Sequence, residues 1–271
     1  MNTYKNLIVI DVDGTLRNDD GIISDRNKEA LDKVMKNGNL AVVCTGRPRH
    51  KSLHIAEEIN SVDYIITLNG AEVFDMANQQ TIYASSLDKE YIYEILEYCY
   101  EKDIRVALTT GTCDYVTKDV RSEIDILLPR DNYKEVLEDT TIIQCMFCDY
   151  RMDVMNELKE KVKKDDVLCI VNAQKGDVDP TRDYWFCIAN KTVSKGNGLK
   201  FLAQHLKVPM ENTIAIGNEK NDISMFEAAS VGVAMGNAND YVKSYANFIT
   251  KSNEEDGVAI YLENKLKNQE L

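Results

Sequence analysis

Short apolar runs recur along the chain, and polar sequence bounds each of them. Their residues are mostly Ile, Val, Leu and Ala, with no regular alternation of polar residues. Runs of this kind predict short β-strands that are buried on both faces, as in a parallel sheet. The clearest runs cover residues 7–10, 40–44, 64–66, 213–216 and 231–234, and a weaker one covers 248–250.

Stretches with apolar residues at helical spacing lie between these strands. Ala30, Leu31 and Val34 fall on one face of a helix that we expect to run from its N-cap, Ser24, to about residue 37. Further helices are expected after residue 48, from Lys195 onward and over 241–246. Strands and helices that alternate at this spacing predict βαβ units, and therefore an α/β fold with a parallel sheet.

The pattern changes between about residues 83 and 189. Helices are expected over 91–99 and 152–162, and strands over 105–108, 142–147, 167–171 and 184–189. Few distinctive polar groups stand at the ends of these strands. We therefore expect an inserted α/β domain of residues 83–189, and a discontinuous core domain of residues 1–82 and 190–271.

Composition and charge narrow the class of protein. The 271 residues are 44% hydrophobic and 28% charged, which fits a globular protein with room for two domains. The formal net charge of −13 argues against nucleic acid or an anionic membrane as the main partner. No apolar run has the length of a membrane span, and Asp11 interrupts the N-terminal run that a signal peptide would need. Seven cysteines without a regular spacing indicate reduced thiols, so we expect a cytoplasmic protein.

Distinctive polar groups stand where the core elements begin or end. Because the backbone is expected to be still extended there, Asp11 and Asp13 should point the same way beyond the first strand. Taken alone, Asp13-Gly14 is also an ordinary turn sequence. The carboxyl ends of parallel strands share one edge, where open α/β sheets bind ligands, so the polar groups are expected to converge. They are Asp11 and Asp13, then Thr45, Lys195, Asn218, Asn221 and Asp222.

These residue types match the requirements of phosphoryl transfer. A carboxylate such as Asp11 can attack phosphorus if a metal ion and a lysine such as Lys195 neutralise the repulsion. Mg²⁺ suits this task, because it binds carboxylate, phosphate and water oxygens. Asp13 would protonate the leaving group, since crowding against Asp11 and Asp222 is expected to raise its pKa. Thr45-Gly46 can bind phosphate through the hydroxyl and a backbone N–H.

Four motifs, in this order, resemble those of the haloacid dehalogenase-like superfamily of phosphatases. They are Asp11-Val12-Asp13-Gly14-Thr15-Leu16, Thr45-Gly46-Arg47, Lys195-Gly196 and Gly217-Asn218-Glu219-Lys220-Asn221-Asp222. Asn69-Gly70-Ala71, Gly236-Asn237-Ala238 and residues 252–258 are similar to the Cof-type sugar-phosphatase branch, as is the insertion between the second and third motifs. The resemblance covers nearly the whole chain.

The resemblance implies a fold, an activity and a role for each motif. The fold would be a Rossmann-like parallel-sheet core with a mobile inserted α/β cap, and the activity would be Mg²⁺-dependent hydrolysis of a small phosphorylated metabolite, most often a sugar phosphate. Asp11 would be the nucleophile and a Mg²⁺ ligand, and Asp13 the general acid and base, with its backbone carbonyl on the metal. Thr45 and Lys195 would hold the phosphoryl group. Further phosphate or substrate contacts would come from Gly14, Gly46, Arg47, Asn69, Gly70 and Asn221.

One position departs from the family pattern. The fourth motif, which completes the metal site, is expected to read Gly-Asp-x-x-Asn-Asp, and Asn218 stands in place of its first aspartate. Asn218 and Asp222 remain the expected metal ligands from this motif, with Glu219 as a candidate substitute. An amide oxygen still binds Mg²⁺, but the site loses one negative charge and some affinity.

Three other functions compete with a phosphatase. A receiver-like signalling module also gathers acidic residues, a threonine and a lysine around Mg²⁺, but it is about half this length and needs no insertion. A phosphotransferase or sugar phosphomutase of the same superfamily would replace water with another hydroxyl. A catalytically weakened phosphometabolite-binding protein would follow from the altered metal site at Asn218. A cation pump with the same chemistry is excluded, because the apolar runs are too short to span a membrane.

Overall fold

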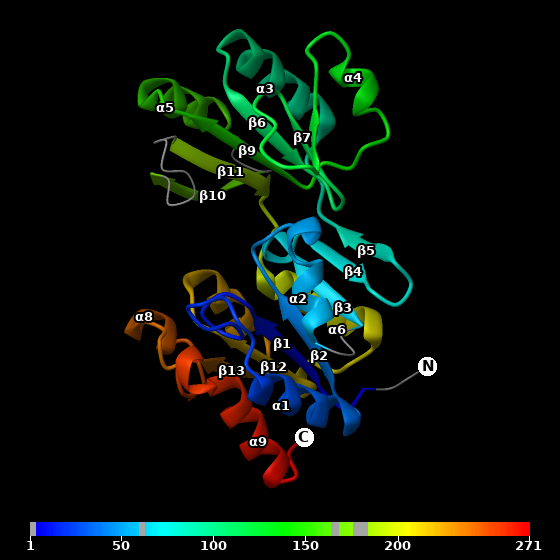
Figure 1. Cartoon of the computed structure of the whole chain (residues 1–271), viewed down its shortest axis with the longest axis vertical. Coiled ribbons are helices and arrows are strands. Elements are labelled where there is room, and N and C mark those ends of the chain that lie inside the picture. Colours follow the sequence, from blue (N-terminus) through cyan, green and yellow to red (C-terminus); the bar gives the residue numbers. More distant parts are fainter. Residues whose placement is uncertain (1–3, 60–62, 164–167, 176–183) are drawn as a thin grey trace. The chain divides into compact units, whose positions relative to one another are not determined.

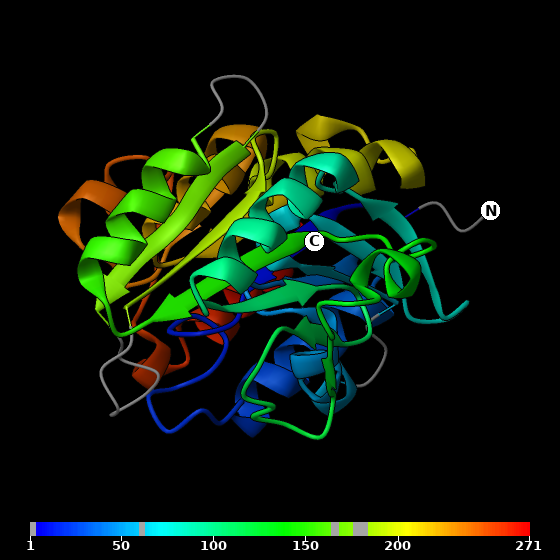
Figure 2. The same cartoon turned by 90° about the horizontal axis from the view of Figure 1, so that it is seen from above.

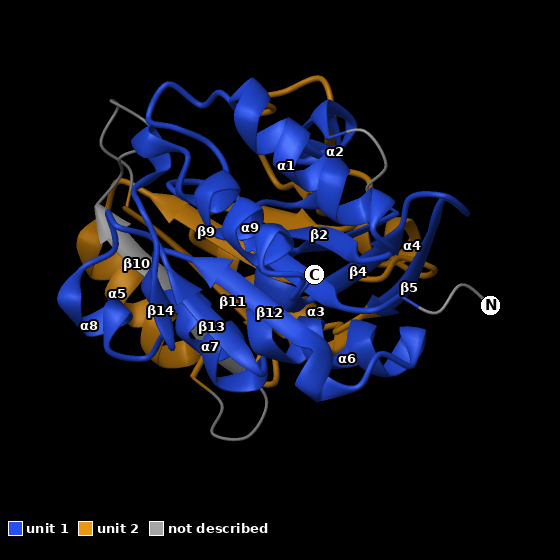
Figure 3. Cartoon of the chain, turned by 90° about the horizontal axis from the view of Figure 1, so that it is seen from below, with its two compact units in different colours: residues 1–83, 194–271 blue, residues 84–193 orange. Residues whose placement is uncertain are grey.

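The computed structural model describes residues 4–59, 63–163, 168–175 and 184–271. The chain divides into two compact units (Figure 3). Unit 1 comprises residues 1–83 and 194–271, and unit 2 comprises residues 84–193. No helix among the described residues is long and apolar enough to cross a membrane.

Unit 1 is built on an eight-stranded sheet in the order β14-β13-β12-β1-β2-β3-β4-β5 (Figure 1). The six strands from β14 to β3 run parallel to one another, and β4 is antiparallel to β3. The central strand β1 therefore pairs with β2 on one side and β12 on the other. The strands are β1 (Leu7–Asp11), β2 (Leu40–Cys44), β3 (Tyr64–Thr67), β4 (Glu72–Asp75), β5 (Gln80–Ala84), β12 (Thr213–Gly217), β13 (Val231–Ala234) and β14 (Phe248–Ile249).

Helices cover both faces of this sheet. Figure 3 shows α1 and α9 on one face, and α6 and α7 on the other. Ser24 caps α1 as the sequence predicted, because its hydroxyl accepts a hydrogen bond from the backbone N–H of Asn27. The helices are α1 (Asp25–Lys36), α2 (Leu53–Glu58), α6 (Lys195–Leu206), α7 (Ile223–Ala228), α8 (Asp240–Lys243) and α9 (Gly257–Lys267).

The apolar runs are continuous because each strand packs on both faces. Ile8 and Ile10 belong to the core that includes residues of α1 and α9. Leu7 and Val9 belong to the opposite core, with residues of α6 and α7. Successive side chains of a strand point to opposite faces, so a two-sided core requires an unbroken apolar run. The predicted parallel-sheet core is confirmed.

Unit 2 contains a six-stranded sheet in the order β10-β11-β9-β6-β7-β8. Its neighbouring strands are antiparallel, except that β7 and β8 are parallel. Figure 2 shows α3 and α5 on the same face of this sheet. The core includes the rings of Phe147 and Phe186, whose centroids lie 5.0 Å apart. The elements are α3 (Lys89–Glu101), β6 (Arg105–Thr109), β7 (Asp114–Val116), β8 (Asp125–Leu127), α4 (Tyr133–Val136), β9 (Gln144–Asp149), α5 (Met152–Lys161), β10 (Leu168–Lys175) and β11 (Tyr184–Asn190).

The structure also contains elements that the sequence did not indicate. β5 is at best half-buried and lies at an edge of its sheet, so its residues carry no continuous apolar run. α9 extends to Lys267, and its last turns are mostly polar. The helix contacts the core through buried residues that include Val258, Ala259, Tyr261 and Leu262. The strand expected over 142–147 begins at Gln144. Val167, the first residue of another expected strand, lies outside the described residues.

Candidate active site

The polar groups predicted to converge come from one edge of the unit 1 sheet. Asp11 is the last residue of β1, Thr45 follows β2, and Asn218 follows β12. Since β1 runs parallel to both neighbours, the three carboxyl ends lie side by side. Leu68–Gly70, a 3₁₀ turn, follows the next strand, β3. The parallel topology therefore brings these polar groups together at one edge of the sheet.

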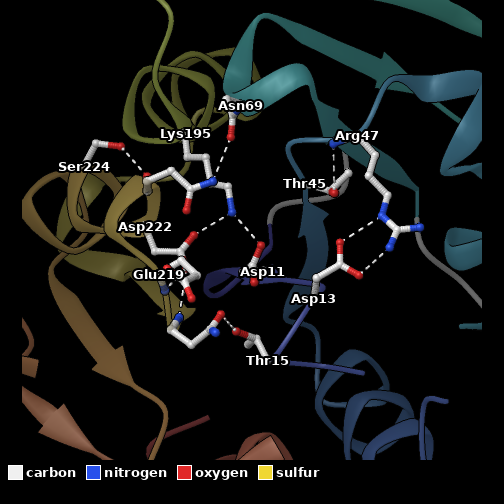
Figure 4. A network of polar contacts seen from close by, with 12 residues as sticks. Asp11, Asp13, Thr15, Thr45, Arg47, Asn69, Lys195, Glu219, Asp222 and Ser224 are labelled. Atoms are coloured by element: carbon white, nitrogen blue, oxygen red, sulfur yellow. Dashed lines mark hydrogen bonds and ion pairs between the residues drawn. The ribbon is translucent and has the colours of Figure 1, made fainter. Parts of the chain in front are cut away.

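A buried ion triad lies at the centre of this edge (Figure 4). Lys195 Nζ lies 2.5 Å from Asp11 Oδ1 and 2.5 Å from Asp222 Oδ1. The three residues are 1%, 6% and 0% exposed, respectively. Two carboxylates share one ammonium, so the triad buries one net negative charge when both carboxylates are ionised. Such a charge favours binding of a cation nearby.

Burial and the charges of the triad shift the pKa values of Asp11 and Lys195. Burial, followed by repulsion from Asp222, raises the pKa of Asp11 to about 7, although Lys195 opposes the change. Burial alone would lower the pKa of Lys195, but attraction to Asp11 and Asp222 outweighs burial and raises it. The two carboxylates therefore favour the protonated form of Lys195.

Close backbone approaches fix the start of α6 and hence Lys195. A Cβ on Gly70, which has φ +91°, would lie 2.1 Å from the backbone oxygen of Ser194. A Cβ on Gly196 would lie 2.0 Å from the backbone oxygen of Ser224. The Ser224 hydroxyl also accepts a hydrogen bond of 3.1 Å from the backbone N–H of Gly196. Ser224 was not predicted from the sequence, because its role is only to hold the backbone of Gly196, next to Lys195.

Asp13 lies apart from the triad. Its carboxylate accepts two hydrogen bonds from the Arg47 guanidinium, at 2.8 and 2.7 Å, and Figure 4 shows it turned toward Arg47 and away from Asp11. The prediction that Asp11 and Asp13 point the same way is therefore wrong. Since β1 ends at Asp11 and Val12 already lies in a turn, the alternation of a strand no longer applies at Asp13. Both side chains of the Asp13–Arg47 pair are about half-exposed, at 51% and 45%.

The Asn218 side chain fills the space between Asp11 and the turn after it. One terminal atom of its amide lies 3.0 Å from the Asp13 carbonyl oxygen and 3.1 Å from Asp11 Oδ2. The same atom lies 2.9 Å from the hydroxyl of Thr15, which is fully buried. Gly14 leaves room for this amide, since a Cβ there would lie 2.5 Å from Asn218 Nδ2. Thr15 belongs to the first motif, but its position in the motif does not predict this contact.

The oxygens around Asn218 fit a magnesium ion. Mg²⁺ binds oxygens octahedrally at about 2.0–2.1 Å, which places adjacent ligands about 2.9 Å apart. An inward Asn218 oxygen at 3.0 Å from the Asp13 carbonyl and 3.1 Å from Asp11 Oδ2 matches that spacing. No group of three or more His, Cys, Asp and Glu side chains among the described residues is arranged to hold a metal. The candidate ligands here include a main-chain carbonyl and an amide instead.

The two acidic residues of the fourth motif, Glu219 and Asp222, make hydrogen bonds to the backbone and to Lys195. Asp222 directs Oδ1 to Lys195, and its Oδ2 accepts the backbone N–H groups of Asn218 and Glu219 at 2.8 and 2.9 Å. The Glu219 side chain accepts the backbone N–H of Asp222, which completes a capping box on the 3₁₀ turn Lys220–Asp222. Asp222 therefore positions the loop and Lys195, and Glu219 is not placed as a substitute ligand.

The predicted phosphate-binding residues form a second group at the same edge. Thr45 is buried, and its hydroxyl accepts a 3.1 Å hydrogen bond from the backbone N–H of Arg47. The backbone N–H of Asn69 donates to the Thr45 carbonyl at 3.0 Å, and Asn221 Nδ2 donates to Asn69 Oδ1 at 2.9 Å. A Cβ on Gly46 would lie 3.1 Å from Asn69 Oδ1. These loops therefore contact one another beside the triad.

Comparison with known proteins gives concordant results. The family model of haloacid dehalogenase-like hydrolases matches residues 8–262. Among similar curated proteins, 5-amino-6-(5-phospho-D-ribitylamino)uracil phosphatase YcsE of Bacillus subtilis is 31% identical, over 93% of this chain and 92% of its own. Phosphatase YwpJ of the same organism is 29% identical, over 93% and 97%.

A solved structure agrees with these matches. The crystal structure of a haloacid dehalogenase-like hydrolase from Bacteroides thetaiotaomicron superimposes with a TM-score of 0.79 at 26% identity. The superposition covers 96% of this chain and 99% of the other. The similarity therefore extends over both units.

Proposed function

Since this chain belongs to the haloacid dehalogenase-like hydrolase family and is a phosphoric monoester hydrolase, we propose that it hydrolyses a small phosphorylated metabolite through an aspartyl-phosphate on Asp11. The observation that carries the proposal is the buried triad of Asp11, Lys195 and Asp222 at the carboxyl edge of the sheet. It combines a carboxylate nucleophile with a permanent positive charge for the phosphoryl group.

Asp11 acts as the nucleophile. Its carboxylate attacks phosphorus, a new bond forms between the Asp11 oxygen and phosphorus, and the bond to the leaving oxygen breaks. Lys195 neutralises part of the negative charge on the phosphoryl oxygens, and the Thr45 hydroxyl and nearby backbone N–H groups bind them. Water then attacks the acyl phosphate, which releases inorganic phosphate and restores the Asp11 carboxylate.

Asp13 acts as general acid for the leaving oxygen and as general base for the water. Its half-exposed position at the rim of the site suits a group that must reach both. Both carboxylate oxygens of Asp13 accept hydrogen bonds from Arg47, so the pair must open before Asp13 can contact the leaving oxygen. A substrate phosphate competes with Asp13 for the same guanidinium, and we propose that substrate binding releases Asp13 in this way.

Asp11, the Asp13 carbonyl and the Asn218 amide oxygen would hold Mg²⁺. When bound, the ion supplies positive charge that stabilises ionised Asp11 and the phosphoryl oxygens. Asp222, which the sequence places among the ligands, serves in this proposal to orient Lys195 and the loop that carries Asn218.

The substrate is proposed to be a sugar phosphate or a similar phosphorylated metabolite. A relative of 31% identity is named for 5-amino-6-(5-phospho-D-ribitylamino)uracil, whose phosphate is carried by a sugar-alcohol chain. The resemblance to Cof-type phosphatases supports the same class. Unit 2 is proposed to act as the cap that selects the leaving group, because the strand-edge residues of unit 1 provide only general phosphoryl chemistry.

Release of p-nitrophenol from p-nitrophenyl phosphate tests the proposal. Wild type should turn over in MgCl₂ and lose activity in EDTA, and Asp11→Asn should lower kcat/KM by at least about 10³-fold. Asp20→Asn makes the same substitution at an exposed loop residue and should leave kcat/KM unchanged. Borohydride treatment during turnover should convert Asp11 to homoserine, which mass spectrometry detects.

Equal activity of wild type and Asp11→Asn would refute the mechanism. Binding of phosphorylated metabolites without any turnover would instead favour the alternative of a catalytically weakened binding protein, which the replacement at Asn218 suggested. A panel of sugar phosphates together with the ribitylaminouracil phosphate then defines the substrate. Transfer of the phosphoryl group to a second sugar in place of water would identify a phosphotransferase.

A further inference from the structure

We propose that the Asn218 amide is a reversible occupant of the metal site, with its N–H groups on Asp11 and the Asp13 carbonyl in the metal-free protein and its oxygen on the metal when a divalent cation binds. The inference rests on the metal site proposed above. It assigns to Asn218 a role that an aspartate at this position could not perform.

The inward atom of the amide contacts only groups that accept hydrogen bonds or can do so. It lies 3.0 Å from the Asp13 carbonyl oxygen, 3.1 Å from Asp11 Oδ2 and 2.9 Å from Thr15 Oγ1. With oxygen inward, the amide oxygen faces oxygens and its nitrogen faces donors; turning the amide over satisfies both ends. In the metal-free protein, the nitrogen-inward orientation is therefore the stable one.

A cation reverses this preference. Three oxygens that repel one another become three ligands once a positive ion lies among them, and amide nitrogen is not a ligand for Mg²⁺. Thr15 serves either orientation, because its hydroxyl accepts from the inward nitrogen or donates to the inward oxygen. The change requires only a half-turn of one amide group, so the surrounding fold is the same in both states.

An aspartate at position 218 could not form the hydrogen bonds that stabilise the metal-free protein. It has no N–H, and it would add a carboxylate beside Asp11, whose buried triad already carries an excess of negative charge. Asn218 therefore stabilises the metal-free protein and weakens cation binding, since the bound state must first give up the nitrogen-inward hydrogen bonds. Glu219 does not offset this loss, because its carboxylate caps the turn at Asp222.

The amide itself gives the most direct test. In ¹⁵N-labelled protein with EDTA, the side-chain NH₂ signals of Asn218, identified by their absence in Asn218→Asp, should exchange slowly with solvent. Saturating Mg²⁺ should shift these signals and increase their exchange by at least about tenfold, because the hydrogen bonds to Asp11 and the Asp13 carbonyl are lost. Signals that are unchanged while calorimetry shows that Mg²⁺ is bound would overturn the inference.

Asn218→Asp provides a second measurement. The variant should bind Mg²⁺ at least about tenfold more tightly, and its Tm in EDTA should fall by about 5 °C or more. Gln204→Glu adds one negative charge at an exposed position of α6 and should change neither quantity. An Asn218→Asp variant as stable as wild type in EDTA would also overturn the inference.

These results separate the inference from the proposed function. If wild type binds Mg²⁺ and hydrolyses phosphate while the amide signals do not respond, only the inference fails. If neither wild type nor Asn218→Asp binds Mg²⁺, both the metal site and the inference fail.

Discussion

Removal of the Lys195 charge should destabilise unit 1 as well as abolish catalysis. Lys195→Met keeps a long unbranched side chain but leaves Asp11 and Asp222 without their shared ammonium. The three residues are nearly inaccessible to solvent, so water cannot replace the lost charge. The variant thus isolates the electrostatic role of the lysine.

The size of the effect follows from the geometry. Each carboxylate oxygen lies 2.5 Å from Nζ, so the two oxygens are at most about 5 Å apart. At an effective dielectric constant of about 20, two unit charges at that separation repel by about 3 kcal/mol. Loss of one partner from a buried ion pair costs about 3–5 kcal/mol in measured cases, which agrees with this value. We therefore expect the free energy of unfolding to fall by about 3–5 kcal/mol.

Urea unfolding followed by circular dichroism measures this change. Lys200→Met removes an exposed lysine from the same helix and should alter the free energy of unfolding by less than about 0.5 kcal/mol. In the double variant Lys195→Met/Asp222→Asn the repulsion is gone, so about 3 kcal/mol of the loss should be recovered.

Two results would refute the electrostatic reasoning. The first is a Lys195→Met variant that is as stable as wild type. The second is a double variant that is less stable than Lys195→Met alone, because packing around Asp222 would then outweigh the repulsion. The activity of Lys195→Met should be lost in either case, since the phosphoryl group still lacks its ammonium partner.

Two further predictions concern Gly70 and the Asp149–Arg151 pair. Gly70→Ala should cost about 2–5 kcal/mol of unfolding free energy and lower kcat/KM, because its Cβ meets the Ser194 oxygen at a positive φ; Gly21→Ala, also at positive φ but in open space, should cost about 1–2 kcal/mol and leave kcat/KM unchanged. Asp149 is buried and its pKa is lowered, chiefly by hydrogen bonds from Arg151 that outweigh burial, so the pair stabilises the fold above the usual Asp pKa and ceases to do so as the pH falls below 3.8. Arg151→Gln should therefore lower the midpoint of urea unfolding at pH 7, and a difference of the same size at pH 3 would contradict this origin.

The amino-acid sequence is enough to predict the parallel sheet and the polar groups that stand at its carboxyl edge. Continuous apolar runs over β1, β2 and β12 require burial on both faces, and helical spacing between them requires a parallel arrangement. Parallel strands bring their carboxyl ends to one edge, so Asp11, Thr45 and the loop after β12 converge whatever the details of packing. β4 and the edge strand β5 escaped prediction, because their pairing with β3 and with each other depends on position in the sheet and not on a continuous apolar run.

The pairing of these groups depends on the three-dimensional fold. Spacing placed Asp11 and Asp13 together, but the strand ends at Asp11, and the turn directs Asp13 to Arg47. The resemblance implies that Asp222 is a metal ligand; in the structure its carboxylate contacts Lys195 and backbone N–H groups. Asn218 stands where the family pattern is expected to have an aspartate, and in the structure its amide lies against the Asp13 carbonyl and Asp11. Hydrogen-bond partners depend on contacts between distant segments, and a pattern along the chain does not encode those contacts locally.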